Sequence, residues 1–127
     1  MTITNYPVGD FLIRVKNAAL AKTKVIMLDN SNLIKSVAEA LKRLGFLEKV
    51  DQKEGRLTIA LMYKSKEPLL SNITLVSKPG LRVYKEASFF QDYKGPSSFI
   101  VTTSRGVLTS VEARKENIGG ELIAEVV

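Results

Sequence analysis

The feature that most limits what this chain can fold into is an amphipathic stripe between residues 31 and 45. Its apolar residues recur at helical spacing, and Asp29-Asn30-Ser31 before it offer side chains that cap a helix N-terminus. The basic pair Lys42-Arg43 and then Gly45 mark the C-terminal end. The pattern predicts a helix with one buried face, made of Leu33, Ile34, Val37, Ala38, Leu41 and Leu44.

A second helix and three strands surround this stripe in the sequence. Pro7 suits the first position of a helix, and apolar residues follow it at helical spacing at Val8, Phe11, Leu12, Val15 and Ala19. Apolar and β-branched runs predict strands over 24–28, 46–50 and 56–63, the last two joined by a polar turn over 51–55. Because both helices need an apolar surface, we expect them to cover one face of a small sheet.

The second half of the chain has a different pattern. The stretch 64–68 shows no apolar periodicity, and short runs at 73–76, 81–84, 98–103 and 122–127 then predict strands. Phe89-Phe90 predict a core anchor in a loop. Thr109 with Glu112 form a capping box that predicts one short helix through about Lys115 or Glu116, ended by Gly119-Gly120. We expect an α+β fold of two small lobes. These are an N-terminal α-β-α-β-β lobe over residues 1–65 and a C-terminal lobe, mostly β with one short helix, over 66–127.

Two residue types are missing, and their absence narrows the chemistry. The sequence has no Cys and no His, which excludes disulfides, thiolate metal sites and imidazole catalysis. The acids lie singly, without a Gly-rich phosphate-binding turn. We therefore expect no enzyme, no catalytic residue, no metal, no cofactor and no small-molecule substrate. We also expect no membrane span and no targeting signal, since neither pattern is visible.

The net charge of +6 and the pI near 9.6 favour a polyanionic partner such as nucleic acid. Residues 1–66 hold 12 Lys and Arg against 6 Asp and Glu, whereas residues 67–127 hold 7 of each. Attraction to phosphate should therefore come from the first lobe, through Lys16, Lys22, Lys24, Lys42 and Arg43. Arg14, Lys16 and Asn17 on the first helix are either a solvated surface or phosphate contacts, and the residues alone leave both open.

The run Thr102-Thr103-Ser104-Arg105-Gly106 is the best candidate for specific recognition. Hydroxyls and backbone N–H groups can bond ribose 2′-hydroxyls, base edges and phosphates at close approach. The same residue types are also common in an ordinary strand-to-helix turn. Spacing alone favours the turn.

Several segments, taken together, are more specific than any of these patterns. They are Pro7–Leu12, Arg14–Ala18, Leu41–Leu47, Ser77–Tyr84, Thr103–Thr109, Glu112–Arg114 and Ile118–Glu121. They cover nearly the whole chain in order. On these segments the chain resembles the S8 family of small-ribosomal-subunit proteins of bacteria and organelles.

The resemblance implies a two-domain α+β protein that binds the central domain of small-subunit ribosomal RNA early in assembly. It also implies support of platform assembly, contacts with neighbouring ribosomal proteins, and a place on a cytoplasmic or an organellar ribosome. Some bacterial members repress their own operon by binding a messenger RNA that imitates the ribosomal site.

Carried over residue by residue, the resemblance implies an RNA-binding group in the C-terminal lobe. Glu121 is informative within it, because phosphates repel a carboxylate and it should face base amino groups instead. Its alternative is a strand residue that faces solvent. The group is Thr102, Thr103, Ser104, Arg105, Gly106, Gly119, Gly120 and Glu121, with Ser77, Lys78, Tyr84 and Lys85 supporting a neighbouring edge.

This chain departs from the family pattern at three places. Tyr6 stands where the family has Asp, so the cap of the first helix is weaker or comes from Asn5. Thr102 stands where the family has Ser, and the segment Lys94–Phe99 replaces a Gly-rich apolar approach to the strand.

Two other function classes stay open from the residues. A basic protein-binding module would place the positive lobe against an acidic partner. A hydrolase or transferase would need Glu121 and another acid to converge in a pocket.

Overall fold

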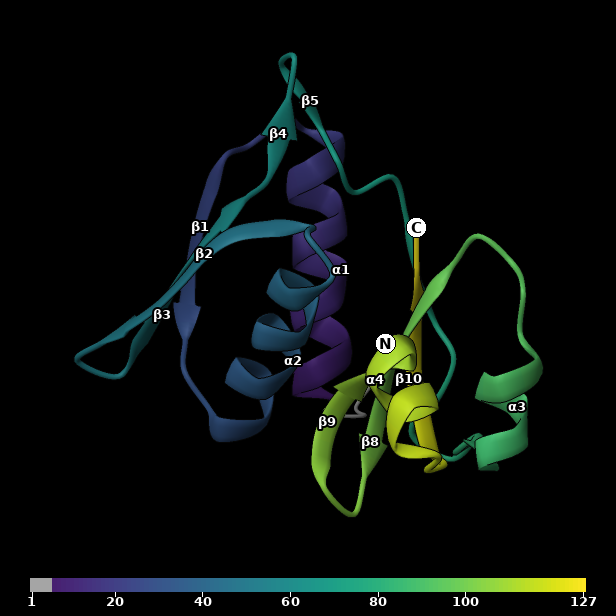
Figure 1. The fold of residues 1–127 in the computed structure, drawn as a ribbon. Coiled ribbons are helices and arrows are strands. Elements are labelled where there is room, and N and C mark those ends of the chain that lie inside the picture. Colours follow the sequence, from purple (N-terminus) through teal and green to yellow (C-terminus); the bar gives the residue numbers. More distant parts are fainter. Residues whose placement is uncertain (1–5) are drawn as a thin grey trace.

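The computed structural model describes residues 6–127, and it places two helices between two antiparallel sheets (Figure 1). These helices are α1 (Pro7–Leu20) and α2 (Asn32–Arg43), close to the two amphipathic stretches of the sequence. In α2, Ser31 accepts a hydrogen bond from the N–H of Ile34, as a cap does. Tyr6 gives α1 no side-chain cap, and the alternative cap Asn5 lies outside the described residues.

The N-terminal sheet consists of β1 (Val25–Asp29), β3 (Arg56–Leu61) and β2 (Leu47–Lys53), in that order. The β2–β3 hairpin is longer than the sequence predicts, since its turn is Glu54-Gly55 and not the whole of 51–55. Both turn residues have positive φ, 52° and 76°, as a two-residue hairpin turn of this hand requires. The strand expected to continue to Tyr63 ends at Leu61.

The stretch 64–68, which shows no apolar periodicity in the sequence, forms the end of a second, smaller hairpin. Its strands are β4 (Tyr63–Lys64) and β5 (Glu67–Pro68), with Ser65 and Lys66 at positive φ in the turn. Figure 1 shows this hairpin projecting from one end of the molecule. The division of the chain at residues 65 and 66 stays a prediction.

The C-terminal sheet has the order β6-β10-β8-β9, with β7 also paired to β10. Its strands are β6 (Ile73–Leu75), β7 (Tyr84–Lys85), β8 (Ser98–Thr103), β9 (Gly106–Thr109) and β10 (Gly120–Val126). The expected strand over 81–84 is reduced to β7, preceded by a turn that the Lys78–Leu81 bridge closes. The strand β9 was not predicted.

Two short helices lie between the C-terminal strands, one after β7 and one after β9. The capping box predicted for α4 (Ser110–Glu116) is confirmed in both directions between Thr109 and Glu112. The last helical residue is Glu116, as predicted, but the left-handed cap is Asn117 and not Gly119-Gly120. The other helix, α3 (Ala87–Asp92), was expected as a loop, although the predicted core anchor Phe90 is buried. The α+β class is confirmed, with one more short helix than predicted.

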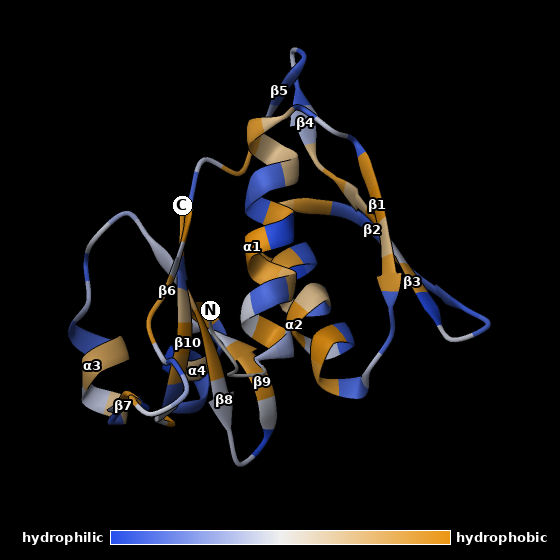
Figure 2. Ribbon diagram, turned by 180° about the vertical axis from the view of Figure 1, so that it is seen from behind, coloured by the Kyte–Doolittle hydropathy of each residue, from blue (hydrophilic) through white to orange (hydrophobic). Residues whose placement is uncertain are grey.

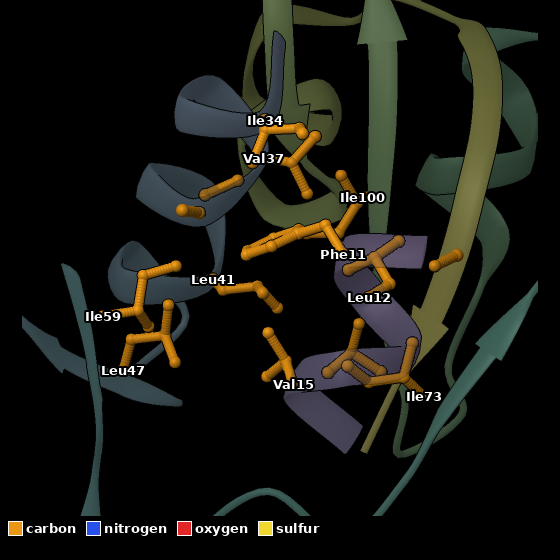
Figure 3. Close-up of a cluster of buried hydrophobic side chains, with 14 of the residues drawn as sticks. Phe11, Leu12, Val15, Ile34, Val37, Leu41, Leu47, Ile59, Ile73 and Ile100 are labelled. Carbon is orange, nitrogen blue, oxygen red and sulfur yellow. The ribbon is translucent and has the colours of Figure 1, made fainter. Parts of the chain in front are cut away.

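One large hydrophobic core joins the two lobes. Figure 3 shows Phe11 and Leu12 of α1 and Leu41 of α2 together with Ile59 of β3 and Ile100 of β8, and all belong to one buried cluster. Leu33, placed in the buried stripe by sequence, is instead 47% exposed. The helices therefore pack against both sheets and not against one.

The C-terminal sheet is covered on both faces. Ile100 and Ala124 belong to the core around α1 and α2, whereas Phe99, Val101 and Leu122 belong to a second cluster with the side chains of α3 and α4. Successive residues of a strand point to opposite faces, so Phe99 and Ile100 can serve different cores. Continuous apolar runs in both strands follow from this arrangement.

Arg43 connects the last turn of α2 to the C-terminal lobe. Its Nε lies 2.8 Å from Oε2 of Glu112, and its Nη2 donates to Oε1 of Glu112 at 3.1 Å and to the carbonyl of Val107 at 3.2 Å. Burial raises the pKa of Glu112, but the Thr109 N–H and Arg43 outweigh it, and the pKa is lowered overall. The same carboxylate thus caps α4 and holds α2 beside it.

Candidate nucleic-acid interface

The run Thr102–Gly106 forms the tip of the β8–β9 hairpin. Thr103 pairs with Gly106, which leaves Ser104 and Arg105 exposed in the turn. The Thr103 hydroxyl accepts from the Arg105 N–H at 3.0 Å and donates to the Gly106 carbonyl at 2.9 Å. The Thr103 side chain therefore shapes the tip, and the Ser104 hydroxyl is presented to solvent.

Arg105 is held along α4. Its Nη1 lies 2.6 Å from Oε1 of Glu116, and 65% of the Arg105 side chain stays exposed. Exposed ion pairs contribute little to stability. The contact nevertheless orients the guanidinium beside the tip, where its remaining N–H groups face solvent and suit a phosphate.

A row of three side chains crosses the sheet next to this tip. Glu121 of β10 pairs with Thr102 of β8 on one side and with Tyr84 of β7 on the other. Directly opposite residues point to the same face of an antiparallel sheet. We call Thr102, Ser104, Arg105, Tyr84 and Glu121 the polar edge. It brings together residues predicted from three separate segments of the sequence.

Glu121 has a cationic neighbour that the sequence reasoning did not assign. Nη1 of Arg82 lies 3.4 Å from Oε2 of Glu121, whose side chain is 18% exposed. The guanidinium lies over the ring of Tyr6, 5.2 Å from its centroid. Burial raises the pKa of the Tyr6 hydroxyl, against the opposing charge of Arg82, so the hydroxyl stays protonated at neutral pH. Arg82 stands two residues before Tyr84, a spacing that could have indicated a shared face.

Gly119 and Gly120 have a packing role. A Cβ on Gly120 would clash with the backbone carbonyl of Thr102, and one on Gly119 would clash with the carbonyl of Lys85. The sequence suggested that these two glycines end α4, but they do not. They allow β7 and β8 to approach β10 closely, which sets the spacing of the polar edge.

The supporting residues separate into buried and exposed positions. Ser77 is fully buried, and its Oγ accepts from the N–H of Val83 at 3.0 Å, so it shapes the loop, and its support of the RNA-binding edge stays a prediction. Lys78 is exposed at the turn. Lys85 is exposed, with its Nζ 5.2 Å from the centroid of the Phe89 ring.

The N-terminal candidates lie apart from the polar edge. Tyr6 and Lys22 flank opposite ends of α1, which spans about 20 Å for its 14 residues. Lys22 pairs with Glu67 at 3.0 Å, and Arg14 donates to the Met27 carbonyl at 3.0 Å. Asn17 and Lys24 are exposed, and Lys16 is half-buried. Seen from behind, this end of the molecule carries the hydrophilic β4–β5 hairpin (Figure 2).

Other kinds of site find little support in residues 6–127. No cluster of three or more acidic side chains there could hold a metal, and no helix in this range is long and apolar enough to cross a membrane. An open hollow of about 560 Å³ beside α3 is bordered by Tyr84, Lys85 and Phe89 but not by Glu121. Glu121 is paired with Arg82 and not with a second acid, which speaks against a carboxylate enzyme.

Comparison with known proteins identifies the family of this chain. The family model described as "Ribosomal protein S8" matches residues 6–127. The small ribosomal subunit protein uS8 of Streptococcus uberis (strain ATCC BAA-854 / 0140J) is 44% identical over 126 residues, which covers 94% of this chain and 96% of that protein. The protein of the same name from Streptococcus pneumoniae serotype 19F (strain G54) matches to the same extent. The chain therefore belongs to the ribosomal protein S8 family.

Proposed function

We propose that this chain is a structural, non-enzymatic protein of the small ribosomal subunit, which binds the central domain of small-subunit ribosomal RNA through the polar edge. The observation that carries this proposal is the row Thr102–Glu121–Tyr84 beside the exposed tip Ser104-Arg105. Family membership supports the ribosomal assignment. The matched relatives come from bacteria, and we place this chain on a cytoplasmic ribosome in the same way.

The chemistry of the polar edge suits a folded RNA with unpaired bases. The hydroxyls of Ser104 and Thr102 can bond ribose 2′-hydroxyls and base edges. Tyr84, 67% exposed, offers a ring on which a base can stack. Arg105 suits a phosphate, and Glu121 suits a base amino group. These are contacts of specificity, since they depend on the position of each group.

The N-terminal lobe supplies attraction that does not depend on sequence. Residues 1–66 carry the whole net charge of the chain, and Lys22 and Lys24 lie at the end of α1 remote from the polar edge. Phosphates at that distance from the polar edge belong to another part of the RNA. Exposed cations there raise the affinity for any RNA and its dependence on salt.

Two further roles extend this proposal. By holding two parts of the central domain at once, the chain supports assembly of the platform and contacts neighbouring ribosomal proteins. A messenger RNA with the same arrangement of unpaired bases would occupy the polar edge in competition with ribosomal RNA, which is the basis for repression of its own operon. Competition binding between the two RNAs measures this directly.

Two variants test the division of labour between the lobes. Filter binding to a central-domain RNA fragment and to an unrelated RNA, each at several salt concentrations, is the measurement. Ser104→Ala should weaken binding to the central-domain fragment by roughly tenfold and leave the unrelated RNA unchanged. Lys22→Gln with Lys24→Gln should weaken both and flatten the salt dependence. If both variants changed specificity and salt dependence alike, or if the wild type did not prefer the fragment, the proposal would be wrong.

A further inference from the structure

Glu121 is the acidic side chain of the polar edge, and its surroundings indicate how an acid can work there. A carboxylate among phosphates needs a nearby cation, and it must be fixed in orientation to accept from one amino group. Arg82 meets the first need through its contact with Oε2 of Glu121. Among residues 6–127 no side chain or N–H bonds Oε1, which leaves that oxygen for a base.

The ring of Tyr6 holds the guanidinium of Arg82 in place. A guanidinium is planar and stacks on aromatic faces, and the 5.2 Å separation from the Tyr6 ring lies within the range of such a contact. The ring lies against the backbone of Gly9, where a Cβ would clash with it. The Tyr6 hydroxyl donates to the carbonyl of Ser77 at 3.1 Å. This hydrogen bond joins Tyr6, the residue before α1, to the start of the loop that carries Arg82.

The loop is also closed against β10. The buried Ser77 hydroxyl bonds the N–H of Val83, and the N–H of Leu122 donates to the Val83 carbonyl at 2.9 Å. Val83 and Leu122 adjoin Arg82 and Glu121 in sequence. The two charged side chains thus project from backbone segments that are hydrogen-bonded to each other.

We propose that Tyr6 and Arg82 are positioning residues for Glu121, holding its Oε2 so that Oε1 faces the RNA and accepts from the amino group of an unpaired base. This inference rests on the proposed function of the polar edge. Arg82 acts through Glu121 and makes no phosphate contact of its own. Tyr6 acts through Arg82, by stacking.

A double-mutant cycle separates this role from a direct phosphate contact by Arg82. Arg82→Met in the full chain should weaken binding to the central-domain fragment about tenfold, with no change in salt dependence or in affinity for an unrelated RNA. In a Glu121→Gln background the same substitution should change affinity less than about twofold, because its target is gone. The matched control Arg56→Met removes another exposed arginine, paired with Asp29 in the N-terminal lobe, and should not lower specificity.

The opposite result would overturn the proposal. If Arg82→Met cost the same in both backgrounds and flattened the salt dependence, Arg82 would contact phosphate directly. If the wild type showed no preference for the fragment, the proposed function itself would fail before any variant was compared.

Two substitutions at Tyr6 test the stack. Tyr6→Phe keeps the ring and should bind the fragment within about threefold of the wild type, whereas Tyr6→Leu should lose about as much as Arg82→Met. Thermal unfolding of both variants identifies any loss that comes from misfolding. A correctly folded Tyr6→Leu that binds like the wild type would contradict the proposal, and so would a Tyr6→Phe as weak as Tyr6→Leu.

Discussion

The two larger sheets of this molecule are supported in different ways. The N-terminal sheet packs one face against α1 and α2 and leaves Val25 and Met27 exposed on the other. The C-terminal sheet is packed on both faces, by α1 and α2 on one side and by α3 and α4 on the other. The net positive charge lies in the half whose sheet is packed on one face only, since residues 1–66 carry all of it.

On the proposed function, this difference matches two kinds of RNA contact. Attraction to phosphate depends on the number of exposed cations, and a simple scaffold with one open face can present them. Reading a base depends on fixed distances between hydroxyl, carboxylate and aromatic groups. A sheet packed on both faces keeps these distances fixed. Substitutions in the two lobes should therefore differ in what they damage.

The largest effect is expected where β8 and β10 touch. Gly120→Ala would force the strands apart at Thr102 and should lower the free energy of unfolding by about 2–3 kcal/mol. Binding to the central-domain fragment should fall by more than about tenfold, because the row Thr102–Glu121–Tyr84 loses its spacing. Urea unfolding and filter binding measure the two.

Gly55→Ala is the matched control in the N-terminal hairpin, where a Cβ meets open space and strain comes from φ alone. It should cost about 1 kcal/mol of stability and leave RNA binding unchanged. Equal losses of RNA binding in the two variants would remove the distinction between the lobes.

Helix capping gives the next comparison. Thr109→Ala removes a buried hydroxyl from a reciprocal capping box and should cost about 1.5 kcal/mol. Ser31→Ala removes a single cap bond made by an exposed serine and should cost about 0.5–1 kcal/mol. Thermal unfolding of both variants gives the order. If Ser31→Ala were the more costly, α4 would be held by the packing of its apolar face and not by its cap.

The ion pair between the lobes predicts a pH dependence. The folded-state pKa of Glu112 is lowered, so its stabilisation is complete above the ordinary value of 4.5 and is lost as the pH falls below it. Glu112→Gln should reduce the loss of stability between about pH 6 and pH 3, while the amide can still cap α4. Arg43→Met should reduce this acid dependence as well and cost about 0.5–1 kcal/mol at neutral pH. Unchanged acid dependence in both would show that other carboxylates control it.

The smallest effect belongs to the exposed pair at the remote end of α1. Lys22→Gln should change the free energy of unfolding by less than about 0.5 kcal/mol and lower the affinity for all RNAs alike by about twofold. Glu67→Gln, which removes the ion pair with Lys22, should raise the affinity for all RNAs slightly. A loss confined to the central-domain fragment would mean that the N-terminal lobe also contributes specificity.

Strong local signals in the sequence predicted most of the regular elements. The stripes of α1 and α2 and the capping box of α4 depend on neighbours within a few residues, and they were confirmed except at Leu33. The helix α3 was missed because it has no side-chain cap and is held by distant contacts, such as that of Phe89 with Phe99. Its stability is tertiary, which a local pattern does not show.

The candidate site was predictable to a similar degree. The tip Ser104-Arg105 is exposed, and Glu121 lies beside Thr102, as the resemblance implied. The burial of Ser77 could not be foreseen, because a serine in a loop is ordinarily exposed. The pairing of Arg82 with Tyr6 and Glu121 joins residues far apart in the sequence, so a local pattern does not show it.

The position of β10 has a consequence for synthesis. This strand spans Gly120–Val126 yet lies between β6 and β8, so the last segment described occupies the interior of its sheet. While a ribosome is still making the chain, β8 and β9 can form a hairpin, but β6 and β7 have no partner until β10 emerges. The N-terminal sheet, whose strands all precede residue 62, can pair earlier. On the proposed division between the lobes, a nascent chain would acquire its attraction to RNA before it acquires its selectivity.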